Sequence, residues 1–317
     1  MSARRPRVWI DCDPGHDDAF ALFLAARTCD VVGVSSVSGN VSLASTTRNA
    51  RIVRDLAGID APLHRGAAGP LVGEPLHAPD IHGDSGLDGP ELPAPRGGVA
   101  PVPAAQAIVE ASLRDEGLWL IATGPLTNLA LALRLDPGLV DRIAGISLMG
   151  GSRTVGNTTP AAEFNILADP EAADAVLRSD ARLIMAGLDL THQFRLGRDE
   201  VAELRGLANP VAGFAADLLG FFLERYEQRS GLPSAPMHDP CAVLAVTDPE
   251  LFERASLNVV VELRGEHTRG MTLCDERDVH RRGTPNVEVL TRIDAEVAWT
   301  RLRDALAAYG AEPGEPG

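Results

Sequence analysis

The chain has 317 residues, of which 45% are hydrophobic and 4% aromatic, and its formal net charge is -15. This length suits one large α/β domain, while an acidic surface repels phosphate groups and disfavours nucleic acid or anionic membranes as partners. There is no apolar run of signal-peptide or membrane-helix length, so we expect a cytoplasmic protein whose cysteines stay reduced.

Short apolar runs alternate with segments of helical spacing at the start of the chain. The runs at 8–10, 31–37 and near 62–64 predict strands, and the segments 17–27 and 42–56 predict helices. This alternation predicts βαβ units and therefore a parallel sheet.

The segment 66–102 breaks this alternation. It is rich in Gly, Pro, Asp and His and shows no periodicity, which is typical of a functional or disordered loop, and we expect it to act as a lid. The alternation then resumes. The expected elements are helix 104–115, strand 118–122, a helix from 127, strand 143–149, loop 150–168, helix 170–178 and strand 182–186.

The last third of the chain is more helical. Residues 198–229 predict helix with a break near Asn209-Pro210, and another helix begins near Asp239. Apolar segments within 257–291 predict an added β-hairpin, followed by helix 294–308. We therefore expect a single domain at 1–308 and a disordered tail at 309–317. The fold class is α/β, with an open, mostly parallel, Rossmann-like sheet flanked by helices.

A cluster of aspartates directly follows the first predicted strand. Asp11, Asp13, Asp17 and Asp18 lie within eight residues, with a Pro-Gly turn between them. Ligands of open α/β sheets bind at the carboxyl ends of strands, and carboxylates this close raise one another's pKa unless a cation neutralises them. The all-oxygen donor set favours a hard cation, Ca²⁺ or Mg²⁺, over a solvated acidic turn that caps the next helix.

Two other acidic motifs share parts of this pattern. An EF-hand loop needs Glu at its twelfth position, where counting from Asp11 or Asp13 gives Leu22 or Leu24. A phosphatase of the haloacid dehalogenase type also begins with DxD after its first strand, with Asp11 as nucleophile. That family carries Thr or Val where this chain has Gly15, so a Mg²⁺-dependent phosphatase stays as the alternative function.

Several segments together resemble the inosine-uridine nucleoside hydrolase family. They follow the family's order along the chain. The matching segments are 11–18 (DCDPGHDD), 38–40 (SGN), 82–89 (HGDSGLDG), 122–128 (ATGPLTN), 149–151 (MGG), 156–157 (GN), 162–165 (AEFN) and 238–240 (HDP). The first and last of these are most similar to the bacterial pyrimidine-preferring ribonucleoside hydrolases. The resemblance covers roughly residues 7–305 and implies the nucleoside hydrolase fold.

The resemblance implies a calcium-dependent glycosidase. It implies that Asp13, Asp18, the Thr123 carbonyl and Asp239 bind Ca²⁺, together with the ribose 2′- and 3′-hydroxyls. Asp13 would also be the base that activates a calcium-bound water, which attacks ribose as the bond to the nucleobase breaks. Asp11 would orient the loop from behind.

The resemblance also implies the residues that contact the nucleoside. Asp17 would bind the 2′-hydroxyl and Asn40 would place the water or ribose. Glu163 and Asn165 would hold the sugar hydroxyls, and a carboxylate at 163 would repel a 5′-phosphate. Without the resemblance, Glu163 and Asn165 read as a polar loop that caps a helix.

A further set of residues would complete the pocket. His238 would protonate the departing base or stack near it, although His beside Asp-Pro is also a common helix cap. The other residues assigned to binding are Met149, Asn157, Phe164, His82 and Tyr226. Met149 reads equally as core, and the pattern assigns no role to His16.

The expected reaction is hydrolysis of ribonucleosides to ribose and free base. Uridine and cytidine are favoured as substrates in pyrimidine salvage, with inosine as the alternative, because no tryptophan lies in the pocket loops. A non-catalytic nucleoside-binding protein is a third hypothesis. The family forms homodimers or homotetramers, so the resemblance implies a homo-oligomer.

Overall fold

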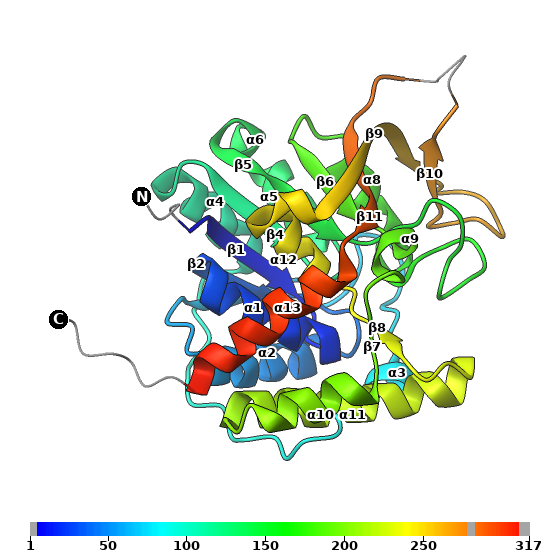
Figure 1. The fold of residues 1–317 in the computed structure, drawn as a ribbon. Helices are drawn as coiled ribbons and strands as arrows, with labels where there is room; N and C mark the ends of the chain where they lie inside the picture. The colour runs from blue at the N-terminus through cyan, green and yellow to red at the C-terminus, as the bar shows by residue number, and fades with distance from the viewer. Residues whose placement is uncertain (1–4, 278–282, 311–317) are drawn as a thin grey trace.

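A nine-stranded sheet runs through the centre of the molecule in the computed structural model, which describes residues 5–277 and 283–310 (Figure 1). Its strands are β1 (Arg7–Cys12), β2 (Asp30–Ser36), β3 (Leu63–Arg65), β4 (Leu118–Ala122), β5 (Ile143–Met149), β6 (Leu183–Ala186), β9 (Phe252–Val261), β10 (Thr272–Asp275) and β11 (Val287–Ile293). Their order is β10-β9-β11-β6-β5-β4-β1-β2-β3. Among these described strands, β9 pairs antiparallel with β10 and β11, and the other neighbouring pairs are parallel. The predicted mostly parallel sheet is confirmed.

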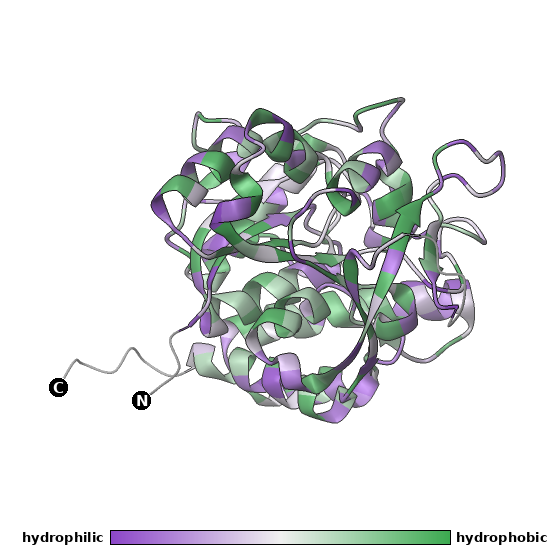
Figure 2. Cartoon of the chain, turned by 90° about the horizontal axis from the view of Figure 1, so that it is seen from above, coloured by the Kyte–Doolittle hydropathy of each residue, from purple (hydrophilic) through white to green (hydrophobic). Residues whose placement is uncertain are grey.

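Two layers of helices bury the two faces of this sheet. Alternate residues of β1 face opposite layers, since Val8 and Ile10 pack in one hydrophobic cluster and Trp9 in the other. The first layer holds α1 (His16–Thr28), α2 (Leu43–Ala57), α11 (Pro210–Ser230), α12 (Pro240–Thr247) and α13 (Ala295–Ala307), and the second holds α4 (Ala104–Arg114), α5 (Thr127–Leu135), α6 (Leu139–Arg142) and α8 (Pro170–Leu177). In Figure 2, hydrophobic strands lie between helices that carry both hydrophobic and hydrophilic residues.

Several short elements complete the described chain. They are α3 (Pro79–His82), α7 (Phe164–Ala168), α9 (Leu188–Thr191), α10 (Arg198–Gly206), the 3-10 turns Pro249–Leu251 and Ala308–Gly310, and a separate antiparallel pair, β7 (Arg195–Leu196) with β8 (Ala235–Pro236). None of the helices in the described ranges is long and apolar enough to cross a membrane. The segments predicted as uninterrupted loops, 66–102 and 150–168, each contain one of these short helices.

The added β-hairpin differs from its prediction. β9 begins at Phe252 and pairs with β10, and β11 lies between β9 and β6 within the main sheet. Val287 and Val289 of β11 are buried, so this strand extends the core. The predicted tail also begins too early, because the Tyr309 hydroxyl donates a hydrogen bond to the Phe23 carbonyl at 2.9 Å. The rest of that predicted tail, 311–317, lies outside the described residues.

Candidate active site

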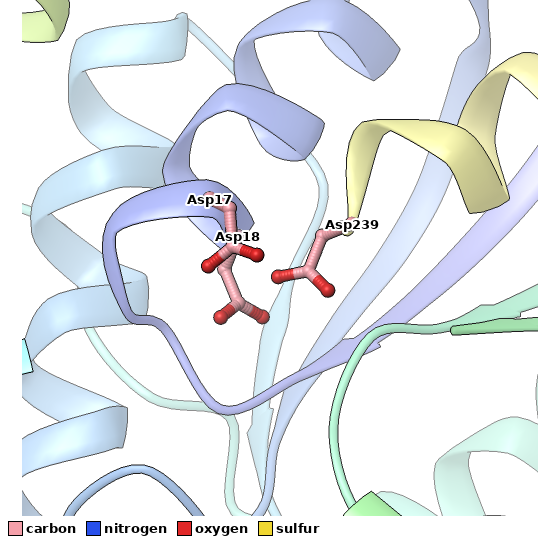
Figure 3. Close-up of side chains that lie close together, drawn as sticks. All are labelled: Asp17, Asp18 and Asp239. Atoms are coloured by element: carbon pink, nitrogen blue, oxygen red, sulfur yellow. The ribbon is translucent and has the colours of Figure 1, made fainter. Parts of the chain in front are cut away.

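Four aspartates gather at the carboxyl end of β1. Asp13 follows this strand, Asp17 and Asp18 lie in the first turn of α1, and Asp239 immediately precedes α12. One carboxylate oxygen each from Asp17, Asp18 and Asp239 lies within 4.8 Å of the others. Figure 3 shows these three side chains extending toward one another from the starts of the two helices. These three carboxylates could therefore hold a metal ion together, and Asp13 lies close to them.

Burial and mutual repulsion disfavour the charged forms of these side chains. All four aspartates are at most 5% exposed. Burial, and then the charge of Asp18, raises the pKa of Asp13 well above its usual range, and the same causes raise that of Asp17 to about 7. Burial and the charge of Asp17 raise the pKa of Asp239 strongly. A divalent cation is the simplest group that would hold this cluster in its ionised form.

Hydrogen bonds fix Asp13 and Asp18 but leave one oxygen free. The Asn40 backbone N–H donates to Asp13 Oδ2 at 2.7 Å, and Thr123 Oγ1 donates to Asp18 Oδ1 at 2.7 Å. The Gly15 N–H donates to Asp18 Oδ2 at 2.9 Å. Asp13 Oδ1 is buried and has no hydrogen-bond partner in the described part of the chain. An unpartnered buried carboxylate oxygen beside three other carboxylates fits a cation ligand.

Asp11 lies behind the cluster in a network of its own. Its Oδ1 accepts hydrogen bonds from Ser35 Oγ and, at 2.8 Å, from Asn128 Nδ2. Trp9 Nε1 donates to Ser35 Oγ at 2.8 Å. Burial raises the pKa of Asp11 to about 7. These contacts tie β1 to β2 and α5, so Asp11 supports the loop that carries Asp13.

A cavity of about 420 Å³ opens above the aspartates. Asp13 and Asp18 are fully buried and lie beneath its wall. The other residues that the sequence assigned to the site all line it. They are Asp17, Asn40, His82, Thr123, Met149, Asn157, Glu163, Phe164, Asn165, Tyr226, His238 and Asp239. The fold therefore brings segments that are far apart in the sequence to one pocket.

Glu163 and Asn165 combine capping contacts with a place in the cavity wall. Glu163 caps α7, since its carboxylate accepts the Asn165 and Ile166 N–H groups at 2.9 and 3.1 Å. Asn165 Nδ2 donates to the carbonyls of Thr123 and Met149 at 2.8 and 3.1 Å. Burial raises the pKa of Glu163 to about 7. Glu163 therefore does cap a helix, as the sequence alone suggested, and both Glu163 and Asn165 also line the cavity.

Imidazole and aromatic rings form part of the cavity wall. His82 Nδ1 lies 3.1 Å from His16 Nδ1, and both imidazoles stack with Phe222. The rings of Phe222 and Tyr226 meet edge to face at 5.7 Å, and the Arg195 guanidinium lies 5.5 Å from the Tyr226 ring centre. Burial lowers the pKa of His16 to about 4, and burial also lowers the pKa of His82 well below its usual range. His16, which the sequence left without a role, therefore supports a cavity residue.

Sequence reasoning missed Phe222 and Thr191. Phe222 lies one helical turn before Tyr226 on α11, so the i, i+4 spacing was the available signal. Thr191 Oγ1 lies 2.7 Å from Nδ1 of His238. Nothing in the sequence around α9 indicates this contact, which joins residues 47 positions apart.

Comparisons with known proteins agree with this geometry. Residues 8–300 match the sequence profile of the family described as inosine-uridine preferring nucleoside hydrolase. The chain is 40% identical over 308 residues to the pyrimidine-specific ribonucleoside hydrolase RihA of Escherichia coli, covering 95% of this chain and 98% of that protein. A purine-preferring ribonucleoside hydrolase from Gardnerella vaginalis has a similar structure, with a TM-score of 0.90 at 30% identity over 96% of this chain and 98% of the other. A plant nucleoside hydrolase matches with a TM-score of 0.88 at 30% identity, covering 96% and 99% of the two chains.

Proposed function

The chain belongs to the inosine-uridine preferring nucleoside hydrolase family and hydrolyses the N-glycosidic bond of ribonucleosides, and we propose that uridine and cytidine are its preferred substrates and Ca²⁺ its metal. Membership of this family argues against the alternative of a Mg²⁺-dependent phosphatase. The complete set of buried carboxylates argues against a protein that only binds nucleosides. One observation carries the proposal: Asp13, Asp17, Asp18 and Asp239 converge under a cavity of about 420 Å³.

The donor atoms support calcium in particular. Asp13, Asp18, Asp239 and the Thr123 carbonyl offer only oxygen, and Ca²⁺ accepts ~6–8 oxygen ligands, which leaves room for substrate hydroxyls. The ion would supply positive charge that lowers the pKa of water and strengthens the binding of the vicinal diol of ribose. A diol requirement would select ribose over 2′-deoxyribose.

The side chains around the metal site would activate the water and position the ribose. Asp13 would accept the proton of the attacking water at Oδ1, the oxygen that has no hydrogen-bond partner among the described residues. Asp17 would accept a hydrogen bond from the 2′-hydroxyl. Asn40 Nδ2, which donates to the Asp13 carbonyl at 3.1 Å, would hold the turn that positions both groups.

The polar wall of the cavity would hold the rest of the sugar. Asn165 Nδ2 is engaged by two carbonyls, which leaves its Oδ1 to accept a hydrogen bond from a ribose hydroxyl. Glu163 would bind the 5′-hydroxyl, and its carboxylate would repel a 5′-phosphate. Asn157, Met149 and Phe164 would close the wall around the sugar. We therefore propose that nucleosides are preferred to nucleotides.

The ring-lined part of the cavity wall would hold the base. His82, Tyr226 and His238 would contact it, with His238 assisting its departure. The 40% identity to a pyrimidine-specific relative supports uridine and cytidine, whereas the aromatic pair Phe222 and Tyr226 keeps inosine as the second candidate. A cytoplasmic location and a homodimeric or homotetrameric assembly complete the proposal.

A substrate panel tests this assignment. We expect release of ribose from uridine and cytidine in the presence of CaCl₂, with kcat/KM for inosine at least about 10-fold lower. We expect 2′-deoxyuridine to lose about 100-fold or more in kcat/KM, because a lost hydroxyl leaves buried polar groups of the site unpaired. Uridine 5′-monophosphate is the matched control for the 5′ side and should be a poor substrate. Equal rates with uridine and deoxyuridine would refute the diol contact.

Two glycines make room for Asp13, and substitution of one should impair catalysis. A Cβ at Gly39 would lie 2.0 Å from Asp13 Oδ2, and one at Gly124 would lie 2.5 Å from Oδ1. We expect Gly39→Ala to lower kcat at least about 10-fold by displacing this carboxylate, since small misplacements cost up to ~10²-fold. Gly213→Ala on α11 is the control and should leave turnover unchanged, because its Cβ would meet no atom within 4 Å in the described part of the chain. Wild-type kcat in Gly39→Ala would contradict the assigned position of Asp13.

A further inference from the structure

The hydroxyl of Thr191 directly contacts the cavity residue His238. Thr191 ends α9 and is fully buried, and its Oγ1 lies 2.7 Å from Nδ1 of His238. In the described part of the chain this is the only hydrogen bond of the Thr191 side chain. His238 lines the cavity, and because Nδ1 is engaged by Thr191, Nε2 is the ring nitrogen that remains available to a cavity ligand.

The direction of this hydrogen bond follows from which of the two groups has a proton to donate. A neutral imidazole carries one N–H, on Nδ1 or on Nε2. If Nδ1 carried it, the Thr191 hydroxyl would accept the bond and its own proton would be buried without an acceptor. If the hydroxyl donates instead, every group is satisfied and the imidazole proton lies on Nε2.

We propose that Thr191 is a positioning residue that holds His238 in the tautomer with Nε2 protonated, so that the ring presents an N–H donor to the departing base. The inference rests on the proposed function of the cavity. No proton changes hands in this step: the N–H donates a hydrogen bond to a carbonyl oxygen or ring nitrogen of the base, where negative charge grows as the glycosidic bond breaks. A neutral imidazole can stabilise developing charge in this way.

Contacts from neighbouring elements hold both the ring and the backbone of His238. The ring centroids of His192 and His238 lie 5.7 Å apart at an interplanar angle of 59°. Asp17 interacts with the backbone of His238 and Asp239, which holds the start of α12 in place. Thr191 thus controls which nitrogen carries the proton, while α12 controls where the ring lies.

Leaving-group dependence tests the proposal. Uridine releases a base that needs a hydrogen-bond donor, whereas 4-nitrophenyl riboside releases a phenolate that is already stable. We expect Thr191→Val to lower kcat for uridine at least about 10-fold with little change in KM, because one lost donor to developing charge costs up to ~10²–10³-fold. Turnover of the nitrophenyl riboside should change less than about 3-fold. Thr191→Ser keeps the hydroxyl and should retain both activities.

Controls separate positioning from folding. Thr247→Val removes a hydroxyl from α12, where it donates to the Val243 carbonyl, and should leave both substrates unaffected. In the His238→Ala background, Thr191→Val should add no further loss for uridine. An equal loss for both substrates, or no loss for uridine, would overturn the proposal.

A spectroscopic measurement reads the tautomer without turnover. In ¹⁵N-histidine-labelled protein, the His238 signals, assigned by comparison with His238→Gln, should show a protonated Nε2 and an unprotonated Nδ1. Thr191→Val should shift them toward a mixture of tautomers. A protonated Nδ1 in the wild type would overturn the inference even if nucleosides are hydrolysed. Absence of hydrolysis with the expected tautomer would instead refute the proposed function.

Discussion

Asp13→Asn is expected to reduce kcat for uridine at least about 10³-fold. The carboxylate is proposed both as base and as a cation ligand, and general base catalysis alone contributes ~10²–10⁴-fold. An amide keeps the shape and can still accept the Asn40 N–H, which lies 2.7 Å from Oδ2. It cannot take a proton from water at the position of Oδ1. The measurement is steady-state release of ribose with saturating CaCl₂.

The same variant should be more stable than the wild type when metal is absent. Burial and Asp18 raise the pKa of Asp13, so ionisation of this buried group opposes folding at neutral pH. Asparagine carries no charge and removes that cost. The melting temperature in EDTA should therefore rise, which separates lost chemistry from lost fold.

Asp11→Asn is the matched control. Asp11 is also buried, and burial raises its pKa to about 7, but its Oδ1 accepts from Ser35 and Asn128, away from the cavity. We expect a loss of kcat at least 10-fold smaller than that of Asp13→Asn. If Asp13→Asn kept more than a tenth of the wild-type kcat, the assignment of the base would be wrong.

Most of the aspartates at the proposed metal site could be predicted from the sequence. Asp13, Asp17 and Asp18 follow one apolar strand directly, so strand periodicity and the carboxylate spacing together located them at the edge of a parallel sheet. Family resemblance was needed for Asp239 and the Thr123 carbonyl, because no local pattern links them to β1. The boundaries of strands β1 to β6 were predicted within two residues, since the inner strands of this part of the sheet are buried on both faces.

The base-facing half could not be obtained in the same way. Phe222 and Tyr226 lie on a long helix with many apolar residues, where periodicity cannot distinguish a cavity ring from a core ring. Thr191 ends a four-residue helix, and β7 and β8 have two residues each, too short for any period. β11 was assigned to a hairpin because its pairing with β6 depends on contacts distant in sequence. Tertiary packing decides all of these features.

Removal of calcium is expected to abolish activity and to make stability depend on pH. With EDTA, kcat should fall at least about 10³-fold and return when CaCl₂ is added. At calcium concentrations near 100 times the dissociation constant, ligand binding stabilises the folded state by ~2.7 kcal/mol. For a domain of this size, that corresponds to a rise in melting temperature of about 4 °C. Thermal melts with and without calcium measure the effect.

The sign of the pH dependence follows from the raised pKa values. In the metal-free folded protein, burial and Asp18 raise the pKa of Asp17 to about 7, whereas an unfolded aspartate has a pKa of ~3.9. Between these two pKa values the folded state binds more protons than the unfolded state. The contribution of Asp17 to the free energy of unfolding is therefore fully present below pH ~4 and is lost as the pH rises through 7. The melting temperature in EDTA should therefore fall between pH 5 and pH 8.

Calcium should oppose this loss, because it binds the ionised carboxylates and makes their deprotonation favourable. Burial also raises the pKa values of Asp11 and Glu163 to about 7. These two side chains should therefore contribute the same pH dependence of the melting temperature with or without calcium. The difference between the calcium and EDTA melts isolates the aspartate cluster, and it should grow as pH rises. A difference that shrinks with rising pH would mean that calcium does not bind the ionised cluster. Asp18→Asn should flatten the difference, since it removes the charge that raises the pKa of both Asp13 and Asp17.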